Sequence, residues 1–298
     1  MALRAETNLI AEEALTVGAH ARVSIIRRVF SEARRSVIFS IGVALATLFL
    51  VVALIGPAIA PYNMTRATAN ALDPPSIGHW FGTDAAGFDV FSRVLGGTQV
   101  DLTVALLATA ISLVVGSLVG LLASFFKERG GEWILRASDL VQAFPLFVLA
   151  MIYVTMAGRN ATNIITVVSV LNVPIYVRLM HNQVQALRNQ AYVEAARADG
   201  DDELSIAFRH VLPNSLTPIW AQASVTLGWS IMITAGLSFI GAGIRPPTPE
   251  WGSMIASGAN GVIIGQWWMS VFPGIAISLS VFAFASVGEL FRKVMYGR

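Results

Sequence analysis

A polar stretch at residues 193–213 holds the residues of this chain that are best suited to chemistry. Charged residues make up only 13% of the protein, yet seven of them gather in this stretch. They are Glu194, Arg197, Asp199, Asp201, Asp202, Glu203 and Arg209. Carboxylates and guanidinium groups at this density need water or ionic partners. The stretch is therefore expected to be displayed outside the apolar parts of the chain.

The local sequence predicts two short helices around Gly200. Residues 192–199 are rich in alanine and favour a helix. Gly200 can adopt the left-handed conformation that ends it. Asp201 can cap a second helix, and Pro213 is expected to stop that helix. The same composition also fits a solvated connection that only links two membrane spans.

Catalytic motifs are missing from the sequence. The four histidines, at positions 20, 79, 181 and 210, lie outside the predicted spans. The string from Gly236 to Phe239 lacks the second glycine of an intramembrane serine protease, and the sequence has no metal-ligand spacing. The only lysines, Lys127 and Lys293, do not follow glycine, so a P-loop is excluded. The sequence thus predicts no enzyme, no metal site and no cofactor bound by this chain.

Composition makes the membrane the natural solvent for this protein. The 298 residues are 55% hydrophobic, with a mean hydropathy of +0.66. Six apolar segments predict an all-α, polytopic protein with six transmembrane helices. They are residues 36–60, 102–126, 140–157 and 161–177, one span within 214–244, and one within 261–288. Residues 1–35 form a polar tail, with no cleavable signal peptide evident, and residues 36–298 form the membrane domain.

The distribution of lysine and arginine predicts how the chain is oriented. Six spans place both termini on one side of the membrane. That side, including the stretch around Gly200, would hold sixteen of the twenty Lys and Arg residues. The other side would hold only Arg66, Arg93, Arg159 and Arg245. This split predicts cytoplasmic N- and C-termini, and it accounts for the net charge of +2 without a nucleic-acid partner.

Several residues in the spans suggest roles in packing or in a polar path. Gly116 and Gly120 form a GxxxG pair that lets another helix approach closely. Pro145 predicts a kink, and Asp139 is expected to cap a helix or to pair with Arg136. Small hydroxyl residues in the fifth span could line a hydrated pore or could only pack against other helices. These are Ser224, Thr226, Ser230, Thr234 and Ser238.

Three motifs, in order, resemble the permease subunits of dipeptide/oligopeptide-type ATP-binding-cassette importers, specifically the second permease type. Glu194-Ala195-Ala196, Gly200 and Leu212-Pro213 are similar to the EAA loop, here placed at 192–213. His210 fits the peptide-importer form of that loop. Residues 79–93 and the string Pro-Pro-Thr-Pro-Glu-Trp-Gly at 246–252 resemble two further family segments. Phe88 stands where the family usually has arginine.

The resemblance implies a fold, a set of partners and a mechanism. It implies a type I importer transmembrane fold in a bacterial inner membrane, forming half of a pore. The implied partners are a second homologous permease, two cytosolic ATPases that bind the ATP and Mg²⁺, and an extracytoplasmic binding protein.

The resemblance also assigns roles to individual residues. The residues expected to couple the pore to the ATPases are Glu194, Ala195, Ala196, Arg197, Gly200, Asp201, Leu212 and Pro213. Those expected to contact the binding protein are Gly82, Thr83, Asp84, Asp89, Pro249, Glu250 and Trp251.

Two questions stay open at the level of sequence. A secondary transporter or channel that works without ATPase partners is the alternative function, although the centres of the predicted spans lack the charged residues that such proteins usually carry. The substrate is also open, because relatives of this kind carry dipeptides, longer peptides, glutathione, nickel chelates, sugars or opines.

Overall fold

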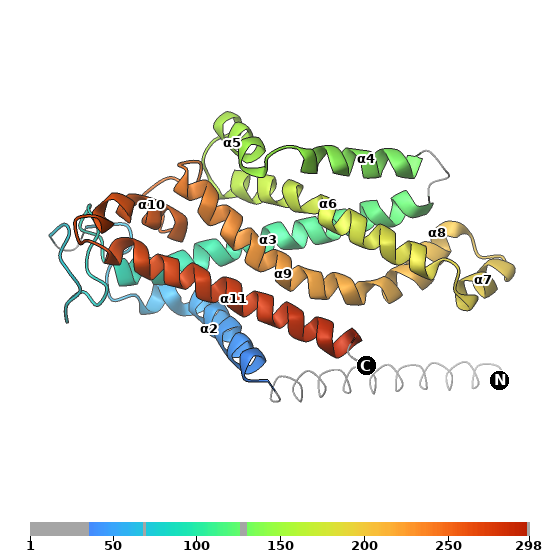
Figure 1. Cartoon of the computed structure of the whole chain (residues 1–298), viewed down its shortest axis with the longest axis horizontal. Coiled ribbons are helices and arrows are strands. Elements are labelled where there is room, and N and C mark those ends of the chain that lie inside the picture. The colour runs from blue at the N-terminus through green and yellow to red at the C-terminus, as the bar shows by residue number, and fades with distance from the viewer. Residues whose placement is uncertain (1–35, 68–69, 126–129, 297–298) are drawn as a thin grey trace, which may run out of the picture.

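The computed structural model describes residues 36–67, 70–125 and 130–296 as a bundle of long helices (Figure 1). The predicted tail at 1–35 lies outside the described residues. The helices are α2 (Val37–Ile59), α3 (Val90–Phe125), α4 (Gly130–Ala143), α5 (Leu146–Ala157), α6 (Ala161–Leu187), α7 (Ala191–Ala198), α8 (Glu203–Ser205), the π-helix η1 (Ile206–Val211), α9 (Leu212–Phe239), α10 (Trp251–Val262) and α11 (Trp268–Tyr296). The all-α prediction is confirmed for these residues.

Four of the described helices are long and apolar enough to cross a membrane: α2, α3, α6 and α11. The predicted third span is broken, because α4 and α5 meet at an angle of 88° beside Pro145. Helix α9 has 28 residues, but its polar and small residues make its hydropathy lower than that of these four helices. The prediction of six spans is therefore confirmed for four helices, while the third is broken and the fifth is less apolar than expected.

Helix α3 lies against α2, α6 and α9, so it forms the spine of the bundle. The two glycines of its GxxxG pair, Gly116 and Gly120, face α6. A Cβ atom added at Gly116 would lie 2.6 Å from the Cβ of Tyr176, and one at Gly120 would lie 2.4 Å from the carbonyl oxygen of Val177. Only glycine permits this distance between the helices, which confirms the close approach predicted from GxxxG.

Helices α3 and α6 run beyond their predicted apolar segments, so several polar and charged residues lie within helices. Helix α3 begins at Val90 and contains Arg93 and Asp101. Helix α6 continues to Leu187 and contains His181. Asp139 of α4 pairs with Arg178 of α6 rather than with Arg136. Folding brings Asp139 and Arg178 together although they are 39 positions apart in the chain.

The two ends of the bundle are formed by different short elements (Figure 1). One end carries α7 and α8, and the opposite end carries α10 together with the connection from α2 to α3. Helix α11 runs from the α10 end toward the α7 end. The motifs that resembled permease segments therefore fall at opposite ends of the molecule.

Candidate functional site

The first half of the polar stretch is a two-turn helix fixed to the bundle by one face. Helix α7 buries Val193 and Ala196, which are 0% and 6% exposed, in a hydrophobic cluster that also contains Val184 of α6 and Ile206 and Ala207 of η1. The exposed face carries Glu194, Ala195 and Arg197. Of the two alanines in the Glu-Ala-Ala motif, Ala196 thus packs inward, while Ala195 faces outward beside the charged residues.

The turn after α7 has the geometry that the sequence predicted for Gly200. Gly200 has a φ of +93°, in the left-handed region that favours glycine. The N–H of Asp201 donates to the carbonyl of Ala196 at 3.1 Å, and the N–H of Gly200 donates to that of Arg197 at 3.3 Å. This pattern satisfies the last carbonyls of α7 and ends it as a Schellman-type turn. A Cβ atom at Gly200 would touch nothing within 4 Å, so backbone conformation alone demands glycine.

The second half of the stretch differs from its prediction in two ways. Asp202, not Asp201, occupies the N-cap position of α8, while Asp201 lies 3.3 Å from Nε2 of His210. Pro213 does not end the helix, because α8 continues through η1 into α9. In η1 the N–H of Leu212 reaches back five residues to Ala207. Pro213 then lies at the start of α9, directly after η1, and the helix continues across it.

Residues 191–211 are called the elbow. Contacts between charged side chains connect its first half to its second half. Nε and Nη2 of Arg197 donate to the two carboxylate oxygens of Glu203 at 2.8 and 3.3 Å. This contact with Glu203 raises the pKa of Arg197, which stays charged. Both side chains are well exposed, so the pair fixes geometry more than it adds stability. Three apolar side chains remain uncovered on the elbow: Tyr192, Leu204 and Phe208, at 40%, 56% and 44% exposure.

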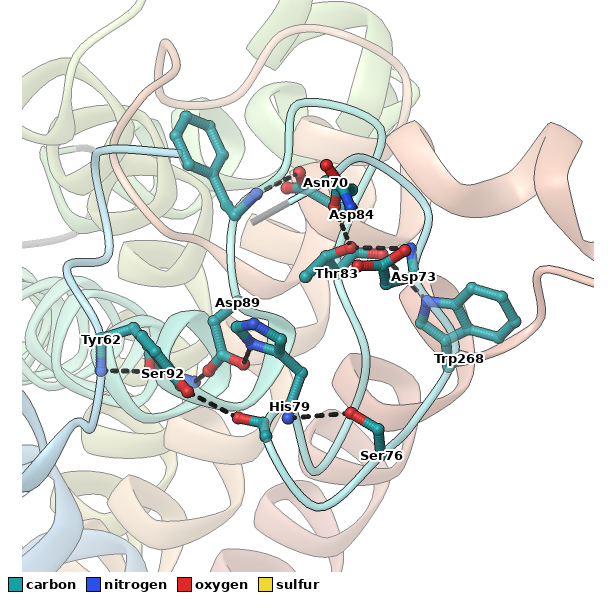
Figure 2. Close-up of polar contacts among 12 residues, drawn as sticks. Tyr62, Asn70, Asp73, Ser76, His79, Thr83, Asp84, Asp89, Ser92 and Trp268 are labelled. Atoms are coloured by element: carbon teal, nitrogen blue, oxygen red, sulfur yellow. Dashed lines mark hydrogen bonds and ion pairs between the residues drawn. The ribbon is translucent and has the colours of Figure 1, made fainter. Parts of the chain in front are cut away.

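The opposite end of the bundle is held by hydrogen bonds around Thr83 (Figure 2). The Thr83 hydroxyl donates to the carbonyl of Asn70 and accepts from the N–H of Asp73, both at 2.8 Å. Nε1 of Trp268 donates to the carbonyl of Thr83 at 3.0 Å. A loop without regular structure is thereby tied to the start of α11.

Asp89 fixes the same loop to the start of α3 (Figure 2). Its Oδ1 lies 2.8 Å from Nδ1 of His79, and its Oδ2 accepts from the N–H of Ser92 at 2.8 Å. The hydroxyl of Ser92 in turn accepts from the N–H of Tyr62. At the position of the usual family arginine, the Phe88 ring lies under the guanidinium of Arg93, 4.8 Å from its centroid. Arg93 is itself held by the carbonyls of Met64 and Pro247.

Sequence comparison identifies the family. The profile of the family described as binding-protein-dependent transport system inner membrane component matches residues 112–295. The chain belongs to this family. It is 34% identical to the dipeptide transport system permease protein DppC of Alkalihalophilus pseudofirmus, over 92% of this chain and 90% of the relative. It is 37% identical to the probable D,D-dipeptide transport system permease protein DdpC of Escherichia coli, over 83% of both chains.

Structural comparison agrees with this assignment. The MetNI methionine ABC transporter in an inward-facing conformation matches with a TM-score of 0.56, over 68% of this chain and 96% of that chain. At 18% identity this likeness shows the fold alone. The expectation of an ABC importer permease subunit is confirmed, and the alternative of a stand-alone secondary transporter or channel is not favoured. A permease subunit of this family is not itself catalytic.

Most of the residues that were expected to contact a binding protein are buried in this permease, and the expected contact itself remains a prediction. Gly82, Thr83, Asp89, Pro249, Glu250 and Trp251 are all buried, and only Asp84 is partly exposed. Polar residues in these loops serve the loops themselves, as in the network of Figure 2. The outer surface is formed instead by neighbours that the sequence did not single out: Ala85, Ala86, Arg245, Pro246 and Pro247.

The hydroxyl residues expected to line a pore are also mostly buried within the permease. Thr226, Ser230, Thr234 and Ser238 are at most 4% exposed. The hydroxyl of Ser230 accepts from Asn172 of α6 at 2.9 Å, so it packs between helices. Only Ser224 is partly open, in an apolar groove between α2, α3, α9 and α11. Sequence reasoning missed the uncovered apolar side chains of α9, which are Trp220, Val225, Trp229, Met232 and Phe239.

Proposed function

We propose that this permease imports peptides or similar small solutes across a bacterial inner membrane. Relatives of known name support the substrate class: they are permeases for dipeptides, for di- and tripeptides, and for glutathione. These solutes share peptide bonds and ionised termini. The working complex would also contain a second homologous permease, two cytosolic ATP-binding subunits and an extracytoplasmic binding protein. ATP and Mg²⁺ would be bound by the ATPase subunits.

In this proposal the elbow and both termini face the cytoplasm. Arg188 follows α6 directly, before α7, Arg197 lies in α7 and Arg209 in η1, whereas Arg245 lies in the loop before α10 and Arg159 donates to the carbonyl of Gly243 in that loop. Cytoplasmic loops carry the excess of arginine and lysine in inner-membrane proteins. The proposed orientation therefore puts the elbow within reach of cytosolic ATPases.

The elbow is the proposed site of coupling to ATP hydrolysis. The observation that carries this proposal is its two-sided construction: Val193 and Ala196 are buried in the bundle, while apolar Tyr192, Leu204 and Phe208 are left uncovered. An apolar patch flanked by charges is typical of a surface that another protein covers. Glu194 and Arg197 would supply ionic contacts beside it, and Gly200 would set the angle between α7 and α8. Leu212 and Pro213 would join this unit to α9.

The end near α10 is the proposed receptor for the binding protein. Because the motif side chains are buried, contact would fall to the exposed parts of the same loops, at Ala85–Ala86 and Arg245–Pro247. The buried residues would support these surfaces from below. Thr83 and Trp268 act in this way, through the hydrogen bond that joins the loop to α11.

Substitution of Gly200 tests the coupling role with a matched control. Gly200→Val forces a β-branched residue into the left-handed region, at a cost of about 1–2 kcal/mol, although its side chain would meet no neighbour. Gly200→Asn places a side chain in the same open space, but asparagine tolerates this conformation. The complex is reconstituted in liposomes, and both ATP hydrolysis and uptake are measured with loaded binding protein.

We expect Gly200→Val to assemble normally, to lose uptake and to hydrolyse ATP without stimulation by the binding protein. Gly200→Asn should keep most of the coupling. Glu194→Lys, which reverses an exposed charge on α7, should also reduce coupling without affecting insertion. Wild-type uptake by a well-assembled Gly200→Val complex would remove the elbow from the mechanism, whatever the substrate.

A further inference from the structure

Two carboxyl groups from distant parts of the chain meet at the first turn of α10. Asp101 belongs to α3, and Glu250 is the N-cap residue of α10. Their exposures are 1% and 0%. Each lies beside the other, close enough for a hydrogen bond between them once one is protonated. Neither the EAA-like elbow nor the loop network of Figure 2 uses this pair.

One carboxylate oxygen of this pair has no hydrogen-bond donor among the described residues. Oδ2 of Asp101 accepts from the N–H of Trp251 at 3.0 Å. The two carboxylate oxygens of Glu250 accept from the N–H groups of Gly252 and Ser253, at 2.9 and 2.8 Å. Oδ1 of Asp101 is buried and has no donor among the described residues. A buried acceptor normally has a hydrogen-bond partner, so the protonation state of this carboxyl group needs an explanation.

Within residues 36–67, 70–125 and 130–296, no basic group takes the role of counterion for the pair. Arg93 lies about two turns earlier on α3, and it is occupied by Asp84 and by the carbonyls of Met64 and Pro247. Arg245, in the loop before α10, is exposed. Helices α2, α9 and α10 contain no charged residue, and α9 contributes only the neutral hydroxyl of Ser238 beside Glu250. The charged residues of α11 are Glu289, Arg292 and Lys293, near its far end.

We propose that Asp101 and Glu250 form a proton-binding site in which one proton, held on Oδ1 of Asp101, is donated to the Glu250 carboxylate. This proton gives the unpartnered oxygen its hydrogen bond and removes one of two adjacent buried charges. It also joins α10 to α3, since each carboxyl group additionally accepts from the first turn of α10. Loss of the proton leaves two buried negative charges side by side, which push α10 and the loop 245–249 away from α3.

The expected pH dependence follows from this arrangement. Burial raises the pKa of Glu250, and hydrogen bonds to its carboxylate offset that rise only in part. A carboxyl group with a raised pKa in the folded state stabilises the fold fully at low pH, and this contribution is lost as pH rises through the folded-state pKa. The two carboxyls titrate as one unit. The attachment of α10 should therefore weaken on the alkaline side.

Asp101→Asn is the test, because asparagine reproduces the protonated form permanently. Its carbonyl can accept from Trp251, and its NH₂ group can donate to Glu250. The thermal midpoint of the assembled complex in detergent is followed from acidic to alkaline pH. We expect the wild-type midpoint to fall toward alkaline pH and the Asp101→Asn midpoint to stay level. Glu132→Gln, which removes an exposed carboxyl on α4, should keep the wild-type pH dependence.

Two further measurements decide where the proton is. Infrared spectra of the wild-type complex at neutral pH should contain a protonated carboxylic acid band that disappears in Asp101→Asn and persists in Glu132→Gln. Glu250→Gln should be less stable than Asp101→Asn at neutral pH, because a glutamine amide loses one of the two N–H acceptors that cap α10.

Absence of the infrared band from the wild type would overturn the proposal. So would an equal pH dependence in the wild type and Asp101→Asn, or failure of Asp101→Asn to assemble. A rise of the wild-type midpoint on adding Ca²⁺ or Na⁺ at alkaline pH, absent in Asp101→Asn, would replace the proton with a cation and equally overturn it.

Discussion

Substitution of Gly120 by alanine measures how tightly α3 and α6 are held together. The added Cβ would lie 2.4 Å from the carbonyl oxygen of Val177 and 3.0 Å from its Cα. Both atoms belong to the backbone of α6, so no side chain can move aside. Restoring a normal contact of about 3.5 Å requires the helices to separate by roughly 1 Å. Overpacking of this kind costs about 2–3 kcal/mol.

Part of this cost is offset because alanine is the better helix former. Replacing a helical glycine by alanine is worth about 1 kcal/mol, so the net loss in the free energy of unfolding should be about 1–2 kcal/mol. Gly274→Ala in α11 is the matched control, because its Cβ would meet only Cδ1 of Ile255, at 4.0 Å. There the helix-forming gain acts alone, and the variant should be more stable than the wild type.

Unfolding by SDS in mixed micelles, followed by circular dichroism, gives the two free energies under the same conditions. The two variants should differ by roughly 2–3 kcal/mol, with Gly120→Ala the weaker. Equal stability of the two would refute the inference that the glycine pair sets the distance between α3 and α6.

Two further predictions concern the ends of the bundle. Trp268→Phe keeps an aromatic ring but loses the N–H that donates to Thr83, so it should lower the free energy of unfolding by about 1–2 kcal/mol and speed proteolysis within the loop before α3. The protein has no cysteine, so Asp199→Cys and Ala86→Cys report orientation directly. A membrane-impermeant thiol reagent added outside intact cells should label Ala86→Cys and not Asp199→Cys, and the opposite pattern would contradict the proposed topology.

Features encoded by neighbouring residues could be predicted from the sequence. The charge-free run at 36–60 became α2 within a residue at each end, because a bilayer-length apolar segment satisfies its backbone only as a helix. The turn at Gly200 was also predictable, since a glycine after an alanine-rich run is a local signal. The GxxxG pair indicated close packing, although the partner helix, α6, could be known only from the fold.

Features that depend on distant residues could not be predicted in the same way. Hydropathy ends a span where apolar residues end, but α3 continues past Asp101 because Trp251, 150 positions away, provides a hydrogen bond to its carboxylate. Pro213 looked like a helix stop, since a change of hydrogen-bond pattern in η1 has no clear local signal. Thr83 looked available to a partner because nothing nearby in the sequence reveals that Trp268 covers it.

The construction of the elbow determines how a force applied to it would spread, if an ATPase acts there as proposed. Val193 and Ala196 share a buried cluster with Ile206 and Ala207 of η1 and with Val184 near the end of α6, so displacement of α7 should move η1 and the end of α6. Since the glycine contacts leave no space between α6 and α3, these two helices should move as one unit. The elbow also continues through η1 into α9 without a loop. A push on α7 would thus reach three of the long helices by direct packing or covalent continuity, whereas α2 and α11 contribute no buried side chain to the cluster beneath the elbow.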